Sequence, residues 1–66
     1  MEDPFGVFFI TKEQRKKLVK MFPGCPVSLV SARWMQIPQN PEEDVLLINE
    51  NAEIVFRMTI EQAFQI

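Results

Sequence analysis

The chain of 66 residues contains no histidine and no tyrosine, and only two glycines. Without histidine, the Ser–His and Cys–His pairs that activate catalytic nucleophiles cannot form. The isolated Gly6 and Gly24 cannot build the glycine-rich loop that cradles phosphates in nucleotide-binding proteins. We therefore expect a non-enzymatic protein that has no catalytic residues and needs no cofactor.

Cysteine occurs once, at Cys25, inside a Pro-Gly-Cys-Pro segment. A single thiol cannot form an internal disulfide, which favours a reducing compartment and predicts a cytoplasmic location. We interpret Cys25 as an unreactive loop thiol. The acidic residues 42–44 are adjacent in sequence and lack the alternating spacing of a calcium-binding loop, so no metal site is expected.

Long apolar runs are also absent. No stretch approaches the ~18 residues that a membrane span needs, and the acidic first residues do not resemble the cationic start of a secretory signal. With 47% hydrophobic and 24% charged residues, the composition is that of a globular chain. We expect one small domain over residues 1–66, with a thin core and no contact with membranes.

The first half of the chain predicts a strand followed by a helix. Residues 5–10 form a continuous apolar run of strand length, typical of a strand that is covered on both faces. Thr11 and Gln14 have the spacing of a capping box, which predicts a helix over residues 12–22 that ends at the following Pro-Gly pair. This helix is amphipathic, with a basic outer side. A second capping-box spacing, Thr59 to Gln62, predicts a short C-terminal helix.

Residues 27–37 fit two interpretations. Apolar and polar residues alternate at first, as in a strand, and a bulge near Ser31 would bring Trp34 back into the pattern. The alternative is a helix capped by Ser28, in which Val30 and Trp34 lie one turn apart. We favour the strand. The order is then β-α-β-β-β-α, an α+β domain whose mostly antiparallel sheet is covered by one amphipathic helix and a short C-terminal helix.

Residues 44–59 predict a β-hairpin with strands over 45–49 and 54–58. A two-residue turn would force Ala52 into a positive φ, so we expect a four-residue loop. The resulting register pairs Asn49 with Ile54, Leu47 with Phe56, and Val45 with Met58.

Both faces of this hairpin are apolar, because paired residues share a face. One face carries the expected core residues Val45, Leu47, Ile54, Phe56 and Met58. The other carries Leu46, Ile48, Val55 and Arg57. An antiparallel hairpin normally has one polar face, so this one needs cover on both sides. The first predicted helix can cover one face, but the C-terminal helix is too short to cover the other.

Large exposed apolar patches on proteins usually mark interaction sites. We therefore predict a protein-binding module, either a homodimer or a small regulator or inhibitor that docks on a larger protein. The predicted partner-binding residues are Trp34, Leu46, Ile48, Val55 and Arg57, which include two residue types enriched at interface hot spots. The simpler interpretations are a Trp34 that fills the core and a self-contained small barrel whose helices cover the outer face.

Charge is distributed unevenly along the chain. Residues 11–22 hold five cationic side chains against one carboxylate, a local balance of +4, whereas residues 38–66 have a balance of −5. A basic helix face can bind phosphates, so nucleic-acid binding is the alternative function, although a net charge of −2 is unusual for it. The residues concerned are Lys12, Lys16, Lys17 and Lys20. A solvated basic face is the simplest interpretation.

Overall fold

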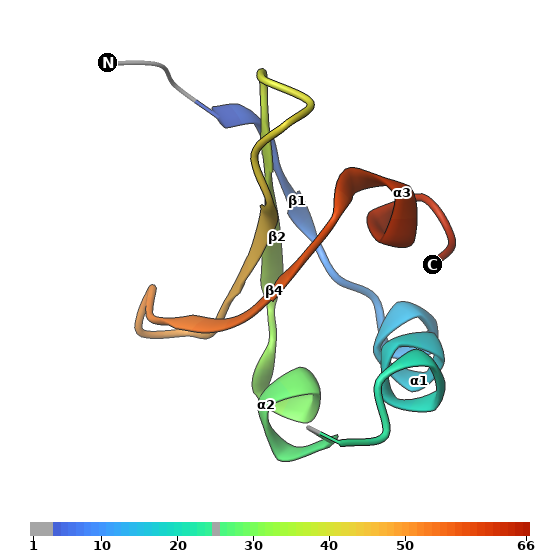
Figure 1. The fold of residues 1–66 in the computed structure, drawn as a ribbon. Helices are drawn as coiled ribbons and strands as arrows, with labels where there is room; N and C mark the ends of the chain where they lie inside the picture. The colour runs from blue at the N-terminus through green and yellow to red at the C-terminus, as the bar shows by residue number, and fades with distance from the viewer. Residues whose placement is uncertain (1–3, 25) are drawn as a thin grey trace.

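The computed structural model describes residues 4–24 and 26–66, so the interpretation of Cys25 lies outside the described residues. In chain order the elements are β1 (Pro4–Phe9), α1 (Lys12–Met21), α2 (Pro26–Ser31), β2 (Trp34–Pro38), β3 (Val45–Ile48), β4 (Ile54–Met58) and α3 (Ile60–Ala63). The strands form one antiparallel sheet in the order β1-β2-β3-β4 (Figure 1). The predicted α+β class with an antiparallel sheet is confirmed.

Two of the helices begin at the capping boxes that the sequence predicts. At α1 the Thr11 hydroxyl accepts a hydrogen bond from the Gln14 amide at 3.1 Å, and the Gln14 side chain accepts one from the Thr11 amide at 3.0 Å. Thr59 and Gln62 repeat both bonds at α3, at 3.1 and 2.9 Å. Each box pairs backbone groups that a helix end leaves without partners.

Residues 27–37 do not form the single strand that we favoured. The chain makes helix α2 up to Ser31 and becomes extended only at Trp34. Pro26 opens the helix, where its fixed φ is suitable and its missing N–H costs nothing. The Ser31 hydroxyl, at the end of the helix, donates to the carbonyls of Val27 and Ser28 one turn earlier, at 3.2 and 3.0 Å. The predicted order therefore becomes β-α-α-β-β-β-α.

The predicted hairpin register is correct at the open end of the hairpin and wrong next to the loop. Val45 pairs with Met58 and Leu47 with Phe56, as predicted, but Ile48 rather than Asn49 lies opposite Ile54. A register shift between Leu47 and Ile48 separates the two halves. The loop is therefore one residue longer than expected.

The longer loop has a local cause. The Asn49 side-chain oxygen accepts hydrogen bonds from the amides of Asn51, at 2.9 Å, and Glu53, at 3.0 Å. These bonds draw Asn49 out of the strand. Ala52 adopts a positive φ of 61°, although the loop is longer than a two-residue turn.

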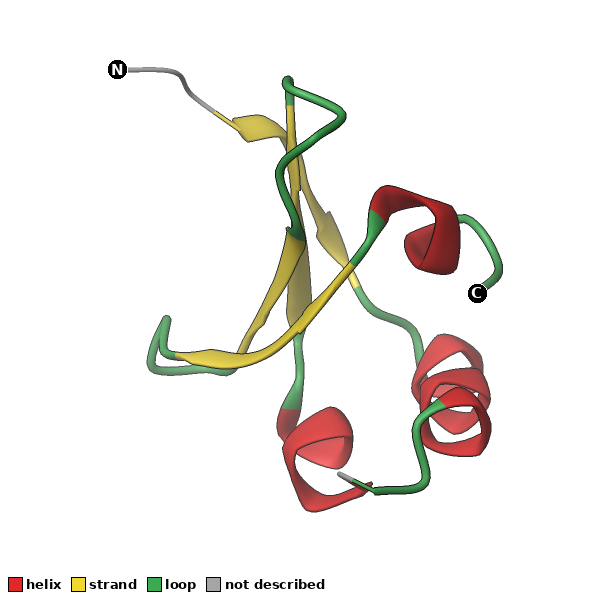
Figure 2. Cartoon of the chain, viewed as in Figure 1, coloured by secondary structure: helices red, strands yellow, loops and turns green. Residues whose placement is uncertain are grey.

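All three helices lie on one side of the sheet. The core cluster contains Leu18 from α1, Leu29 from α2 and Ala63 from α3, packed against sheet residues that include Met35 and Leu47. Figures 1 and 2 show the sheet nearly edge-on, with α1 and α3 beside the same face. In the part of the chain that the structure describes, no helix covers the other face, because α2 also contributes to this one core.

Candidate functional site

The strand register assigns each sheet residue to one of two faces. Phe8, Met35, Leu47 and Phe56 lie in one cross-strand row. This row faces the helices, since Met35 and Leu47 are core residues. The neighbouring rows point to the opposite side. We call that side the open sheet face; its residues are Val7, Phe9, Trp34, Gln36, Leu46, Ile48, Ile54 and Arg57.

The open sheet face is apolar and partly accessible. Phe9 is 62% exposed and Val7 is 53% exposed, both on the edge strand β1. The rings of Phe9 and Trp34 pack edge to face, with centroids 6.5 Å apart. Ile48, opposite Trp34, is buried but stands outside the core cluster. An aromatic pair at an apolar surface is the kind of feature around which interface hot spots form.

Charge is confined to one margin of this face. Arg57 is the single charged residue on it, and it lies on the other edge strand, β4. Arg57 makes no ion pair within the described ranges, where Arg33 and Glu50 form the one salt bridge, at 3.4 Å. The central strands β2 and β3 contribute only Trp34, Gln36, Leu46 and Ile48 to the face. Its centre is therefore uncharged.

The structure brings together four of the five predicted partner-binding residues: Trp34, Leu46, Ile48 and Arg57. Val55 is different, because it is partly buried and packs against the core cluster. Ile54, predicted to be a core residue, is instead 51% exposed. The register shift explains both errors. Leu47 pairs with Phe56 and Ile48 with Ile54, so Val55 is an extra residue of β4, and the strict alternation of faces is broken there.

Sequence reasoning missed Val7 and Phe9 as members of the open sheet face. Residues 5–10 are apolar without interruption, so no alternation indicates which side chains point toward the core. The signal was indirect: Phe9 pairs with Trp34, and Trp34 was already a candidate. Only the register of β1 on β2 reveals the pairing.

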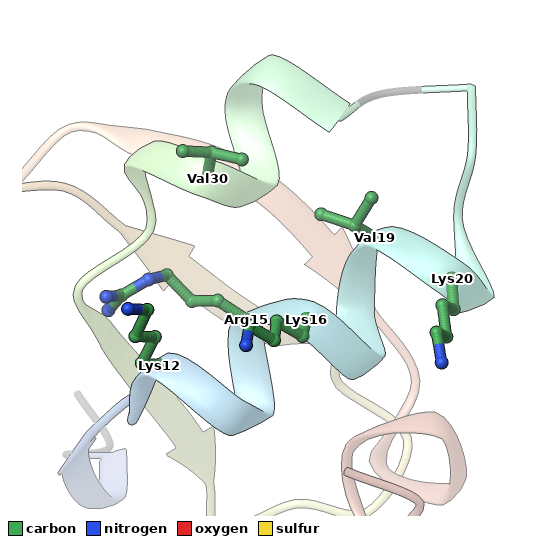
Figure 3. A pocket seen from close by; sticks show the side chains of 6 residues that line it. All are labelled: Lys12, Arg15, Lys16, Val19, Lys20 and Val30. Carbon is green, nitrogen blue, oxygen red and sulfur yellow. The ribbon is translucent and has the colours of Figure 1, made fainter.

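A second surface lies between α1 and α2. It is a pocket of about 500 Å³, lined by Lys12, Arg15, Lys16, Val19, Lys20 and Val30, which we call the basic pocket. Figure 3 shows the cationic side chains along α1, with Val19 on α1 and Val30 on α2. Lys12, Lys16 and Lys20 recur every four residues and therefore share one side of the helix.

Two details modify the predicted basic face. Lys17, the fourth predicted residue, is exposed on α1 but does not line the basic pocket. Arg15, which was not among the candidates, does line it, and its Nη1 donates to the Ile10 carbonyl at 3.0 Å. That bond holds the guanidinium in place, whereas the lysine side chains are exposed.

Comparison with protein-family models, with curated proteins and with solved structures finds no match to this chain. Over the described ranges, none of the helices is both long and apolar enough to cross a membrane. Function must therefore be inferred from the chemistry of the open sheet face and the basic pocket.

Proposed function

We propose that this chain is a non-enzymatic protein-interaction module that associates through the open sheet face. The observation that carries the proposal is the aromatic pair of the exposed Phe9 and the partly buried Trp34, on a sheet whose helices all pack against the other side. Burying the exposed part of Phe9 removes on the order of 100 Å² of apolar surface from water, which contributes about 2.5 kcal/mol.

The occupant that we propose is a second copy of the chain. A two-fold contact brings the same patch of each copy together, so a charge near its centre would repel its counterpart. The centre of the open sheet face is uncharged, and Arg57 lies on an edge strand, away from it. Homodimer interfaces are also more apolar than those between different proteins. Stacking of two such faces about 10 Å apart makes a β-sandwich.

The size of the face limits the affinity. Four strands of about five residues, spaced about 4.8 Å apart, present roughly 300–400 Å² in projection. A stacked pair therefore lies at the low end of specific interfaces. We expect a dissociation constant in the micromolar range, set mainly by the aromatic pair.

The test is sedimentation equilibrium over a range of protein concentrations, on the wild type and on two matched variants. Phe9→Glu places a charge on the open sheet face, whereas Phe64→Glu makes the same change at the 75% exposed C-cap residue of α3, a helix on the other side of the sheet. We expect Phe9→Glu to be monomeric and Phe64→Glu to dimerise like the wild type. Circular dichroism checks that both variants remain folded.

A wild type that stays monomeric up to millimolar concentration would exclude the second copy as occupant. The open sheet face would then have to serve the other role expected from the sequence, a regulator or inhibitor docking on a larger protein. Equal loss of dimer in both variants would show that the contact lies elsewhere on the molecule. Either result overturns the proposal of a dimer through the open sheet face.

A further inference from the structure

We infer that the basic pocket is a second docking site, independent of the open sheet face, and that it takes an acidic amphipathic segment of a partner protein. Charge complementarity is the first argument. Four cationic side chains line the pocket, while Glu13, the one carboxylate of α1, does not. Like charges one helical turn apart repel one another and destabilise the helix. Carboxylates from a partner would relieve this repulsion.

None of these cations has a carboxylate partner in the described structure, where the ion pair found joins Arg33 to Glu50 outside the pocket. Arg15 is held by the Ile10 carbonyl, so its charge is fixed at the pocket before a ligand arrives. Binding then costs little reorganisation of the guanidinium. The partner segment must supply negative charge along the length of α1 from Lys12 to Lys20.

The apolar part of the pocket is the second argument. Val19 from α1 and Val30 from α2 contribute the two aliphatic side chains of the lining. Val30 is 56% exposed, although it belongs to a helix whose Leu29 is completely buried. A ligand that carries charge alone leaves these valines in water. A segment with an apolar side chain between its acidic residues covers them.

The shape favours a protein segment over a small ligand. Small-molecule sites bury most of the surface of their ligand, but Lys12, Lys16, Lys20 and Val30 are all exposed. The pocket is thus an open groove between two helices. Such grooves bind an amphipathic helix, which presents its apolar residues at intervals of three or four.

Nucleic acid, the alternative expected from the sequence, suits this pocket less well. Phosphates gain nothing from contact with valine side chains, and no aromatic residue lines the pocket to stack on a base. Lys17 also lies outside it. An electrostatic phosphate-binding face would use every lysine of α1 alike.

The experiment uses a fluorescein-labelled synthetic helix-forming peptide in which leucine recurs every three or four residues, flanked by glutamate. Fluorescence anisotropy measures its dissociation constant. A second peptide carries glutamine at every glutamate position. Lys16→Glu and Lys17→Glu change the net charge equally, but only Lys16 lines the pocket. Val30→Ser and Val27→Ser form the apolar pair, because Val27 is 80% exposed and lies outside the lining.

We expect Lys16→Glu to weaken binding of the glutamate peptide roughly five- to tenfold more than Lys17→Glu does. Val30→Ser should weaken it and Val27→Ser should not, and the glutamine peptide should bind poorly to every variant. Self-association, measured by sedimentation, should be the same in Lys16→Glu as in the wild type. That result would separate the basic pocket from the open sheet face.

Three outcomes overturn the inference. Equal effects of Lys16→Glu and Lys17→Glu would mean that binding depends on overall charge. Tighter binding of a single-stranded DNA probe, lost to the same extent in both lysine variants, would assign the lysines to nucleic acid. Loss of self-association in Lys16→Glu would make the pocket part of the contact between two copies.

Discussion

Replacement of Ala52 by glycine should stabilise this protein, although the same change in most loops destabilises. Ala52 has φ 61°, in the left-handed region. An L residue with a Cβ costs about 1–2 kcal/mol there, whereas glycine adopts the conformation freely. Glycine also loses more conformational entropy than alanine on folding, which lowers the free energy of unfolding by about 0.5–1 kcal/mol. We expect a net gain of about 0.5–1 kcal/mol.

The measurement is thermal and urea unfolding followed by circular dichroism. For a domain of this size 1 kcal/mol shifts Tm by about 4–8 °C, so we expect Ala52→Gly to raise Tm by about 2–8 °C. The urea m-value should not change, since the surface exposed on unfolding is the same. Gly24→Ala is a matched reverse substitution, because Gly24 has no positive φ and a Cβ there meets nothing within 4 Å. It should also stabilise, by about 0.4–1 kcal/mol.

A decrease in Tm for Ala52→Gly would refute this reasoning. It would mean that the positive φ at residue 52 costs alanine less than the conformational entropy that glycine loses on folding. Gly24→Ala lies far from the hairpin in the chain. It shows separately whether replacing a glycine stabilises this protein by reducing the conformational entropy of the unfolded chain.

Two further predictions concern the sheet and the helix cap. Val55→Glu should unfold the domain or cost more than 2 kcal/mol, because it buries a charge beside the core cluster, whereas Ile54→Glu, at a 51% exposed residue, should leave the monomer folded. Urea denaturation compares the two variants, and similar stabilities would refute the register shift between β3 and β4. Thr11→Ala should lower stability by about 1 kcal/mol through loss of its bond to the Gln14 amide. Thr11→Ser, which keeps the hydroxyl, is its control, and a Thr11→Ala variant as stable as the wild type would show that the cap contributes nothing.

The parts of the fold that sequence reasoning predicted well are those decided by neighbours in the chain. A capping box needs only Thr11 and Gln14, three residues apart, and its bonds form as predicted. The central hairpin pairs, such as Leu47 with Phe56, follow from the nearness of the two strands in sequence. Residues 27–37 were harder because they contain a helix and a strand in succession, and each pattern fits only half of the segment.

The sequence predicted an apolar sheet face as the candidate site, but not all of its residues. Trp34, Leu46, Ile48 and Arg57 do share one face, but a one-residue shift exchanged Ile54 and Val55. The shift depends on the bonds that the Asn49 side chain makes within the loop. A strict alternation assumed along the strand cannot anticipate it.

By itself, the sequence determined that this chain carries more apolar strand surface than its helices can cover, and that its cations gather on one helix face. Both are properties of composition and spacing, so they hold for any arrangement of the elements. Only the tertiary structure decided where the cover lies. Residues 27–37 do supply an additional helix, but Leu29 packs into the same core as Leu18. The extra helix therefore adds to the side already covered, and the open sheet face is left without a helix over it among the described residues.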